Sequence, residues 1–216
     1  MVTDRRTAAT YLLYSMAGFA LGCKGRTTMG NDLSLHATFT LRDEELLLTY
    51  EVKNRSKRDA YLINRLYSLA PTFEFSPDIV YVDLDPITKT IRFYKNHPTQ
   101  HMDEGEDGPT SLIFGYHTPV RAGTSFQEDI HIRLPVYYYN GYGTRSPPPD
   151  PWPATYKHVY FSVAYWWRPE WQREEVLDMF GTPTLMPVDC FSVPKELRGI
   201  LETDRINLKV PVFERG

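Results

Sequence analysis

The chain has 216 residues, of which 42% are hydrophobic and 24% charged, and this balance is ordinary for a globular protein. Its formal net charge is −3 and its sequence has no block of Lys and Arg, which argues against a nucleic-acid-binding surface. Two cysteines, Cys23 and Cys190, are too few for a small scaffold built on disulfides. The 15 Tyr, 11 Phe and 17 Pro favour many short strands over long helices.

The N-terminus has the layout of a signal peptide. Arg5 and Arg6 precede a mostly apolar run over residues 8–21, which is too short to cross a bilayer. The run ends in Ala20-Leu21-Gly22-Cys23, which resembles a bacterial lipobox with its first two residues in reverse order. The resemblance implies cleavage before Cys23 and lipidation of that residue. We therefore expect a signal peptide at residues 1–22, a tether at 23–32 and one domain at 33–216.

Two alternatives to a signal peptide remain. The segment could form an amphipathic helix of a cytosolic protein, or Met29 could be the true initiator. With a lipid anchor the protein would lie in the cell envelope, either periplasmic or on the outer surface. Without a signal it would be cytoplasmic.

The clearest structural pattern is an alternation of apolar and polar residues, which is typical of strands with one buried face. It occurs at residues 33–41 and again at 46–52, with a tight turn between them. A turn-forming segment then follows at residues 54–59, and a further alternating run at 61–66. We expect residues 46–67 to form the central hairpin of a β-sandwich.

The remainder of the chain predicts further strands. Residues 79–84 and 90–94 should form a hairpin through a turn begun by Asp85-Pro86, and residues 112–116, 126–134, 159–165 and 208–212 should form other strands. Residues 173–180 carry apolar residues at helical spacing before Gly181, which predicts one short helix. Residues 182–201, interrupted by proline, should form a loop.

The segment most suited to binding is YYYNGYGTRSPPPDPWP, at residues 137–153. Exposed Tyr and Trp side chains give a large contact area at low entropic cost. The candidate partner-binding residues are Tyr137, Tyr138, Tyr139, Tyr142 and Trp152. The alternative is a long connection between the two sheets, held in place by buried aromatic residues.

Sequence motifs for catalysis or for cofactors are absent. The chain has no G-x-S-x-G, Gly-rich phosphate loop, H-E-x-x-H or C-x-x-C motif. The acidic, His-containing segment at residues 97–109 could bind a divalent ion, but its spacing matches no EF-hand and we expect a solvated loop. We therefore predict a non-enzymatic protein with no metal and no cofactor.

Val52-Lys53-Asn54-Arg55-Ser56 resembles the V-x-N-x-S strand–turn of immunoglobulin-like sandwich modules in bacterial envelope proteins, and the intracellular proteinase inhibitor family has a similar element. Ala122-Gly123-Thr124-Ser125 resembles the entry to a late strand of such modules. The resemblance implies an all-β, immunoglobulin-like sandwich of two antiparallel sheets, here with one short helix and long loops. Together with the lipobox it predicts an envelope lipoprotein that binds a protein partner or has a structural role. An inhibitor or immunity protein that blocks a protease or toxin is the alternative.

Overall fold

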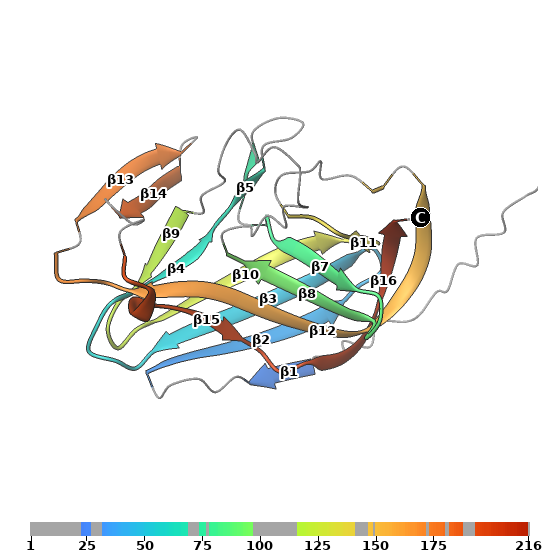
Figure 1. The fold of residues 1–216 in the computed structure, drawn as a ribbon, viewed down its shortest axis with the longest axis horizontal. Helices are drawn as coiled ribbons and strands as arrows, with labels where there is room; N and C mark the ends of the chain where they lie inside the picture. Colours follow the sequence, from blue (N-terminus) through green and yellow to red (C-terminus); the bar gives the residue numbers. More distant parts are fainter. Residues whose placement is uncertain are drawn as a thin grey trace, which may run out of the picture.

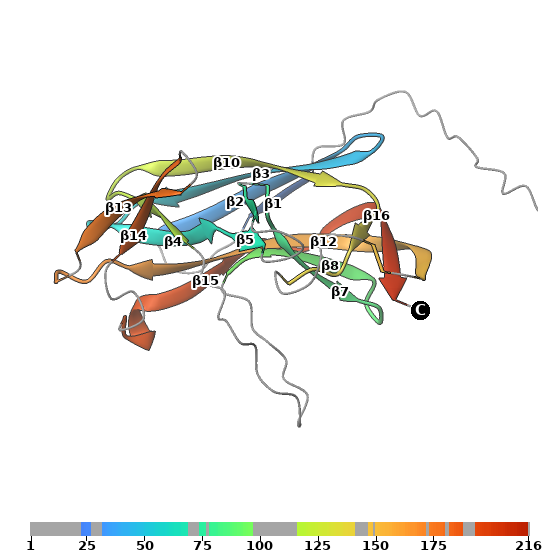
Figure 2. The same cartoon turned by 90° about the horizontal axis from the view of Figure 1, so that it is seen from above.

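Two β-sheets lie face to face (Figures 1 and 2), which confirms the prediction of an all-β sandwich. The computed structural model describes residues 23–26, 32–68, 74–76, 78–96, 116–140, 147–148, 150–171, 173–179, 182–187 and 193–215. Residues 1–22, the acidic segment at 97–109, Tyr142 and Cys190 lie outside the described residues. No helix among the described residues is long and apolar enough to cross a membrane.

In the part of the chain that the structure describes, the smaller sheet has four antiparallel strands in the order β1-β2-β3-β10. They are β1 (Cys23–Arg26), β2 (Leu33–Leu41), β3 (Glu45–Asn54) and β10 (Ser125–Arg133). The predicted alternation is confirmed in β2 and β3, where every second side chain is buried. β1 lies within the segment expected to be a tether and pairs with β2.

Among the described residues the larger sheet has ten strands, and most of its pairing involves the long strand β12 (Pro151–Trp167). One edge of β12 pairs with β16 (Ile206–Arg215) and β15 (Arg198–Glu202), and the other with β8 (Thr90–Lys95) and β4 (Ala60–Arg65). The sheet continues through β7 (Tyr81–Asp85), β9 (Tyr116–Val120), β11 (Val136–Tyr137), β13 (Glu174–Met179) and β14 (Thr182–Pro187). β8 runs parallel to β12 and β11 parallel to β16, so this sheet is mixed where two antiparallel sheets were expected.

A small pair, β5 (Tyr67–Ser68) and β6 (Glu74–Phe75), stands apart from both sheets. The hydrophobic core fills the space between the two main sheets. Phe39 of the smaller sheet lies 6.0 Å from Phe93 of the larger sheet, and Tyr50 lies 4.7 Å from Phe161, measured between ring centroids. All four side chains are fully buried.

The expected central hairpin at residues 46–67 is wrong, because β3 and β4 belong to different sheets. The chain crosses between the layers at residues 55–59, and Asn54 holds this corner. Its side-chain oxygen accepts hydrogen bonds from the amide and hydroxyl of Ser56, at 3.0 and 2.7 Å. Its side-chain nitrogen donates to the carbonyl oxygens of Arg58 and Val120, at 2.7 and 2.9 Å. Alternation identifies a strand but does not identify its partner.

The predicted hairpin after residue 79 is confirmed as β7 and β8. In its turn the Asp85 carboxylate accepts the amides of Ile87 and Thr88, at 2.9 and 3.1 Å, which is the expected role of an Asp that begins a turn.

The predicted helix at residues 173–180 is wrong. Residues 174–179 form strand β13, which pairs along its whole length with β14. A short apolar run fits a strand as well as a helix, and pairing with the neighbouring segment decides between them. The predicted loop at residues 182–201 accordingly contains β14, a 3₁₀ helix (Lys195–Leu197) and the start of β15.

Candidate functional site

A cavity of about 440 Å³ opens where the chain leaves β10 of the smaller sheet and enters β11 of the larger sheet. The Leu134–Pro135 peptide bond in this crossing is cis. Most of the lining is apolar or aromatic, and its main side chains are Val80, Val82, Ile132, Val136, Tyr139 and Phe213. The volume lies within the range of about 300–1,000 Å³ that is typical of ligand sites. We call this feature the β10–β11 cavity.

Two of the five predicted partner-binding residues line the β10–β11 cavity. Tyr137 is half-buried in β11, whereas Tyr139 is buried and its main chain exchanges two hydrogen bonds with Val82, at 2.7 and 3.0 Å. Tyr138 and Trp152 are exposed, with 38% and 66% of their surfaces accessible, and neither lines the cavity. The predicted loop at residues 137–153 is therefore partly strand, since it includes β11 and the start of β12.

Three ionisable side chains also line the β10–β11 cavity: Asp78, His131 and Arg133. The Asp78 carboxylate accepts the main-chain amide of His131 at 2.9 Å, which links the two layers at this edge. His131 Nδ1 lies 3.0 Å from a carboxylate oxygen of Glu45. Arg133 is exposed, and its guanidinium has no ion-pair partner among the described residues. The lining of the cavity therefore combines apolar and aromatic side chains with charged ones, among them the exposed cation Arg133.

A second group of polar residues lies buried between the two sheets. Lys95 of β8 is fully buried and donates to Glu128 of β10 at 2.7 Å, and also to the carbonyl oxygen of Asn64 at 3.2 Å. Glu128 further accepts the hydroxyl of Tyr50 and the guanidinium of Arg65, both at 2.8 Å. Burial lowers the pKa of Lys95, and burial followed by the charge of Glu128 raises the pKa of Tyr50.

The Lys95–Glu128 pair crosses the interface between the sheets. Both side chains form further hydrogen bonds, as a buried ion pair requires. The pair is far better suited to fixing how the sheets stack than to binding a ligand. Sequence reasoning missed this pair, although the alternation contains a signal for it. Glu128 falls in phase with the buried residues Ile130 and Ile132, and Lys95 falls in phase with Ile91 and Phe93.

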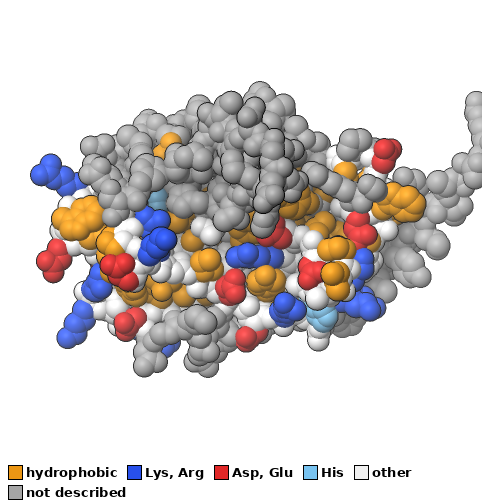
Figure 3. All heavy atoms as spheres, in the orientation of Figure 1, with side chains coloured by type: hydrophobic (Ala, Val, Ile, Leu, Met, Phe, Trp, Pro, Cys, Tyr) orange, Lys and Arg blue, Asp and Glu red, His pale blue; other side chains and the backbone are white. Residues whose placement is uncertain are grey.

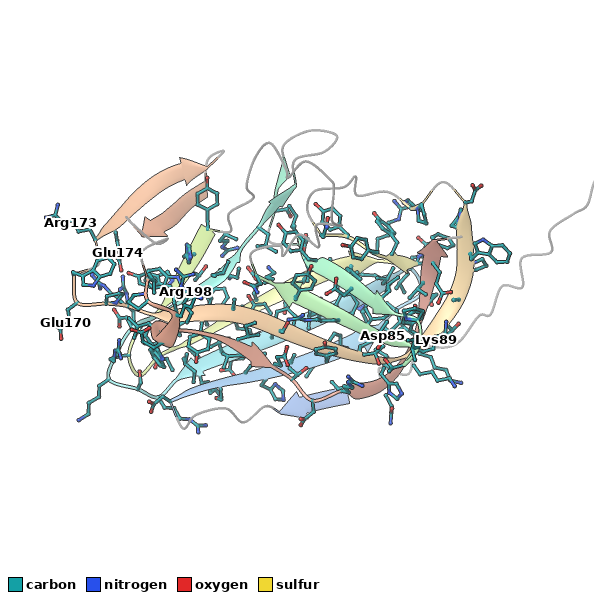
Figure 4. The ribbon with its side chains drawn as sticks, viewed as in Figure 1. Asp85, Lys89, Glu170, Arg173, Glu174 and Arg198 are labelled. Carbon is teal, nitrogen blue, oxygen red and sulfur yellow. The ribbon has the colours of Figure 1, made fainter. Side chains whose placement is uncertain are left out.

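A third cluster joins the β13–β14 hairpin to the sandwich. Arg121 donates to Glu174 of β13 at 3.1 Å from each of its two terminal nitrogens, and to Asp59 at 2.8 Å. Figure 4 shows Glu174 where β13 begins, at the opposite end of the molecule from the turn that holds Asp85 and Lys89. The hydroxyl of Tyr61 also donates to Glu174.

These contacts shift two carboxyl groups in the same direction. Hydrogen bonds from Arg121 hold the pKa of Glu174 below its usual value. Burial opposes the shift at Asp59, but the amide of Ala122 and the side chain of Arg121 nevertheless lower the pKa of that carboxyl. Both carboxylates are therefore held as anions by cations, which favours a structural role for this cluster.

Two further features bear on the choice of site: metal-binding groups in the described part of the chain and the charge on the face seen in Figure 3. No cluster of three or more His, Cys, Asp or Glu side chains there could hold a metal ion. Figure 3 shows acidic and basic side chains interspersed on the face in view. The β10–β11 cavity is accordingly the best candidate for a binding site.

Comparison with known proteins adds no relative. No family model matches the chain, and neither the search of curated proteins nor the search of solved structures found a match.

Proposed function

We propose that the protein is a non-enzymatic β-sandwich module that binds a protein partner at the β10–β11 cavity. The observation that carries the proposal is a cavity at the crossing between the two sheets, lined mostly by apolar and aromatic side chains. Tyr137 and Tyr139 contribute to its wall. Tyrosine suits such a site because its ring offers apolar contact while its hydroxyl forms hydrogen bonds.

The β10–β11 cavity differs in one respect from the two polar clusters described above. The side chains of the Lys95–Glu128 pair and of the Arg121–Glu174 cluster are engaged with one another. The β10–β11 cavity, by contrast, is lined mostly by apolar and aromatic side chains that a partner's side chain would cover. Removal of that apolar surface from water would contribute to the binding free energy, at about 25 cal/mol per Å².

Selection of peptides from a random displayed library on the purified protein tests this proposal. Val82→Phe, which fills the cavity, and Tyr137→Ala, which removes part of its wall, should each abolish binding of the selected peptides. Trp152→Ala is the matched control, since it removes an exposed aromatic residue outside the cavity and should leave binding unchanged. Near-UV circular dichroism establishes that each variant is folded. Failure to select any peptide, or binding that survives both cavity variants, would contradict the proposal.

We also propose that the module is an immunoglobulin-like lipoprotein of a bacterial envelope, anchored through Cys23. The support is the Ala20-Leu21-Gly22-Cys23 sequence and the resemblance of the segment around Asn54 to envelope modules. Expression of the full chain in a bacterial host with a radiolabelled fatty acid should label the wild type but not Cys23→Ala. If the wild-type protein is not labelled, the lipoprotein proposal is wrong, whereas the proposed binding at the β10–β11 cavity is not affected.

A further inference from the structure

Strand β10 is an edge of the smaller sheet, and one side of its main chain faces away from β3. The amide of Leu134 donates to Glu44 at 3.0 Å, and the carbonyl oxygen of Thr124 accepts from Asn54 at 2.9 Å. Main-chain groups point to alternate sides along a strand, so even-numbered residues of β10 bond to β3 and odd-numbered residues face outward. Within the described residues, the outward main-chain groups of Gln127 and Asp129 have no hydrogen-bond partner.

The free edge of β10 ends at the β10–β11 cavity. His131 is the next outward-facing residue, and its amide donates a hydrogen bond to the Asp78 carboxylate at 2.9 Å. His131 and Arg133 both line the cavity. An extended segment that paired with Gln127 and Asp129 would therefore reach the cavity within a few residues, because a strand rises about 3.3 Å per residue.

The charge beside the cavity indicates one property of such a segment. Arg133 is exposed, lines the cavity and has no ion-pair partner among the described residues, whereas the Asp78 carboxylate is already engaged by the His131 amide. A guanidinium suits a carboxylate because its planar fork matches two carboxylate oxygens.

We infer that the partner binds as an added β-strand along the free edge of β10, with an apolar side chain in the β10–β11 cavity and the carboxylate of an Asp or Glu side chain on Arg133. The inference rests on the proposed function and adds the mode of recognition to it. Main-chain hydrogen bonds supply affinity in strand addition, and the cavity and Arg133 supply specificity.

Proline substitution tests the main-chain part of the inference. Gln127→Pro removes an outward amide while leaving the hydrogen bonds to β3 in place, because proline is tolerated where the N–H of an edge strand faces solvent. This variant should bind a selected peptide with about tenfold lower affinity, as the loss of one hydrogen bond predicts. The comparison variant Gln127→Ala changes the side chain alone, so any further loss of affinity in Gln127→Pro belongs to the missing amide.

Chemical variants of the selected peptide also test whether it binds as an added strand. N-methylation of its amides, one at a time, should weaken binding at every second residue, since only alternate amides face β10. Uniform sensitivity or none along the peptide would overturn strand addition, as would unchanged affinity for Gln127→Pro.

Exchange of charge tests the role of Arg133. Peptides selected on wild type should carry an acidic residue near an apolar one, and peptides selected on Arg133→Glu should carry a basic residue instead. If both selections give the same apolar motif without a charge preference, the cavity binds a partner as proposed but the assignment of Arg133 is wrong. If neither selects a peptide, the proposed function itself fails.

A second copy of the chain is the competing occupant of this edge. Sedimentation of the wild type should show a monomer at micromolar concentration. A dimer that Gln127→Pro dissociates and Gln127→Ala does not would mean that β10 pairs with β10 of another copy, and it would overturn the inference.

Discussion

The ammonium of Lys95 on the larger sheet lies 2.7 Å from the carboxylate of Glu128 on the smaller sheet, and both side chains are buried. This ion pair joins the two layers within a largely apolar interface. Since it forms only at one relative placement of the sheets, it fixes how they stack.

Loss of the Glu128 carboxylate should be strongly destabilising. Glu128→Ala leaves the amine of Lys95 buried without its anion, and Tyr50 and Arg65 lose their acceptor as well. We expect the free energy of unfolding in urea to fall by about 3–5 kcal/mol. Glu51→Ala is the control, because Glu51 lies on the solvent side of neighbouring β3 and should change stability by no more than about 0.5 kcal/mol. A small effect of Glu128→Ala would mean that the pair does not hold the sheets.

The corner at Asn54 should be sensitive to a conservative change. Asn54→Asp keeps the oxygen that Ser56 bonds but removes the two amide hydrogens donated to Arg58 and Val120. We expect a loss of about 1–3 kcal/mol, since two carbonyl oxygens lose their donor beside a new charge. Arg55→Ala, at an exposed position of the same corner, should be nearly neutral. Equal midpoints of urea unfolding for the two variants would contradict this role of Asn54.

The Arg121–Glu174 cluster predicts how stability depends on pH. The pKa of Glu174 is lower in the folded protein than in the unfolded chain, so the folded state binds fewer protons and is favoured by rising pH. This contribution is complete above the unfolded pKa of about 4.3 and is lost as the pH falls through the folded pKa. The wild type should therefore be more stable than Glu174→Gln at pH 7, and the difference should shrink in acid.

Melting temperatures of the wild type and Glu174→Gln between neutral and acid pH check this prediction. Glu170→Gln is the control, since Glu170 is exposed and has no described ion pair. A stability difference that stays constant down to the lowest pH would show that Glu174 acts through something other than its charge.

Gly199 of β15 should not tolerate a larger residue. A Cβ atom at this position would lie 2.6 Å from the hydroxyl oxygen of Tyr165, on the neighbouring strand β12, and 2.7 Å from two carbons of its ring. Gly199→Ala should therefore destabilise the protein by about 1–3 kcal/mol, as overpacking does elsewhere. The same change in a Tyr165→Ala background should cost much less, and unfolding of the four proteins in urea gives the coupling. Additive effects would mean that the ring moves aside freely.

Much of the fold follows from local alternation. In β2 and β3 the apolar residues mark the buried face directly, and the Asp85 turn identifies the β7–β8 hairpin. Pairing between distant segments is not encoded in this way. Residues 46–67 contain two correctly predicted strands, yet their separation into two sheets depends on contacts such as the one between Asn54 and Val120.

The candidate site was predicted in part for the same reason. Tyr137 and Tyr139 were selected by composition, but the cavity arises where β7, β10 and β16 come together, and these strands lie far apart in sequence. Arg133 lies on the exposed face of β10. Its position beside the cavity is a property of the crossing from β10 to β11.

The 17 residues of β12 also have a consequence for the order of folding. One edge of this strand pairs with β4 and β8, which are synthesised long before it, and the other with β15 and β16, which are synthesised after it. Such pairing across large sequence separations makes folding slow. A nascent chain would therefore expose an unpaired edge of β12 until β15 and β16 have been synthesised, and an unpaired edge strand is prone to aggregation.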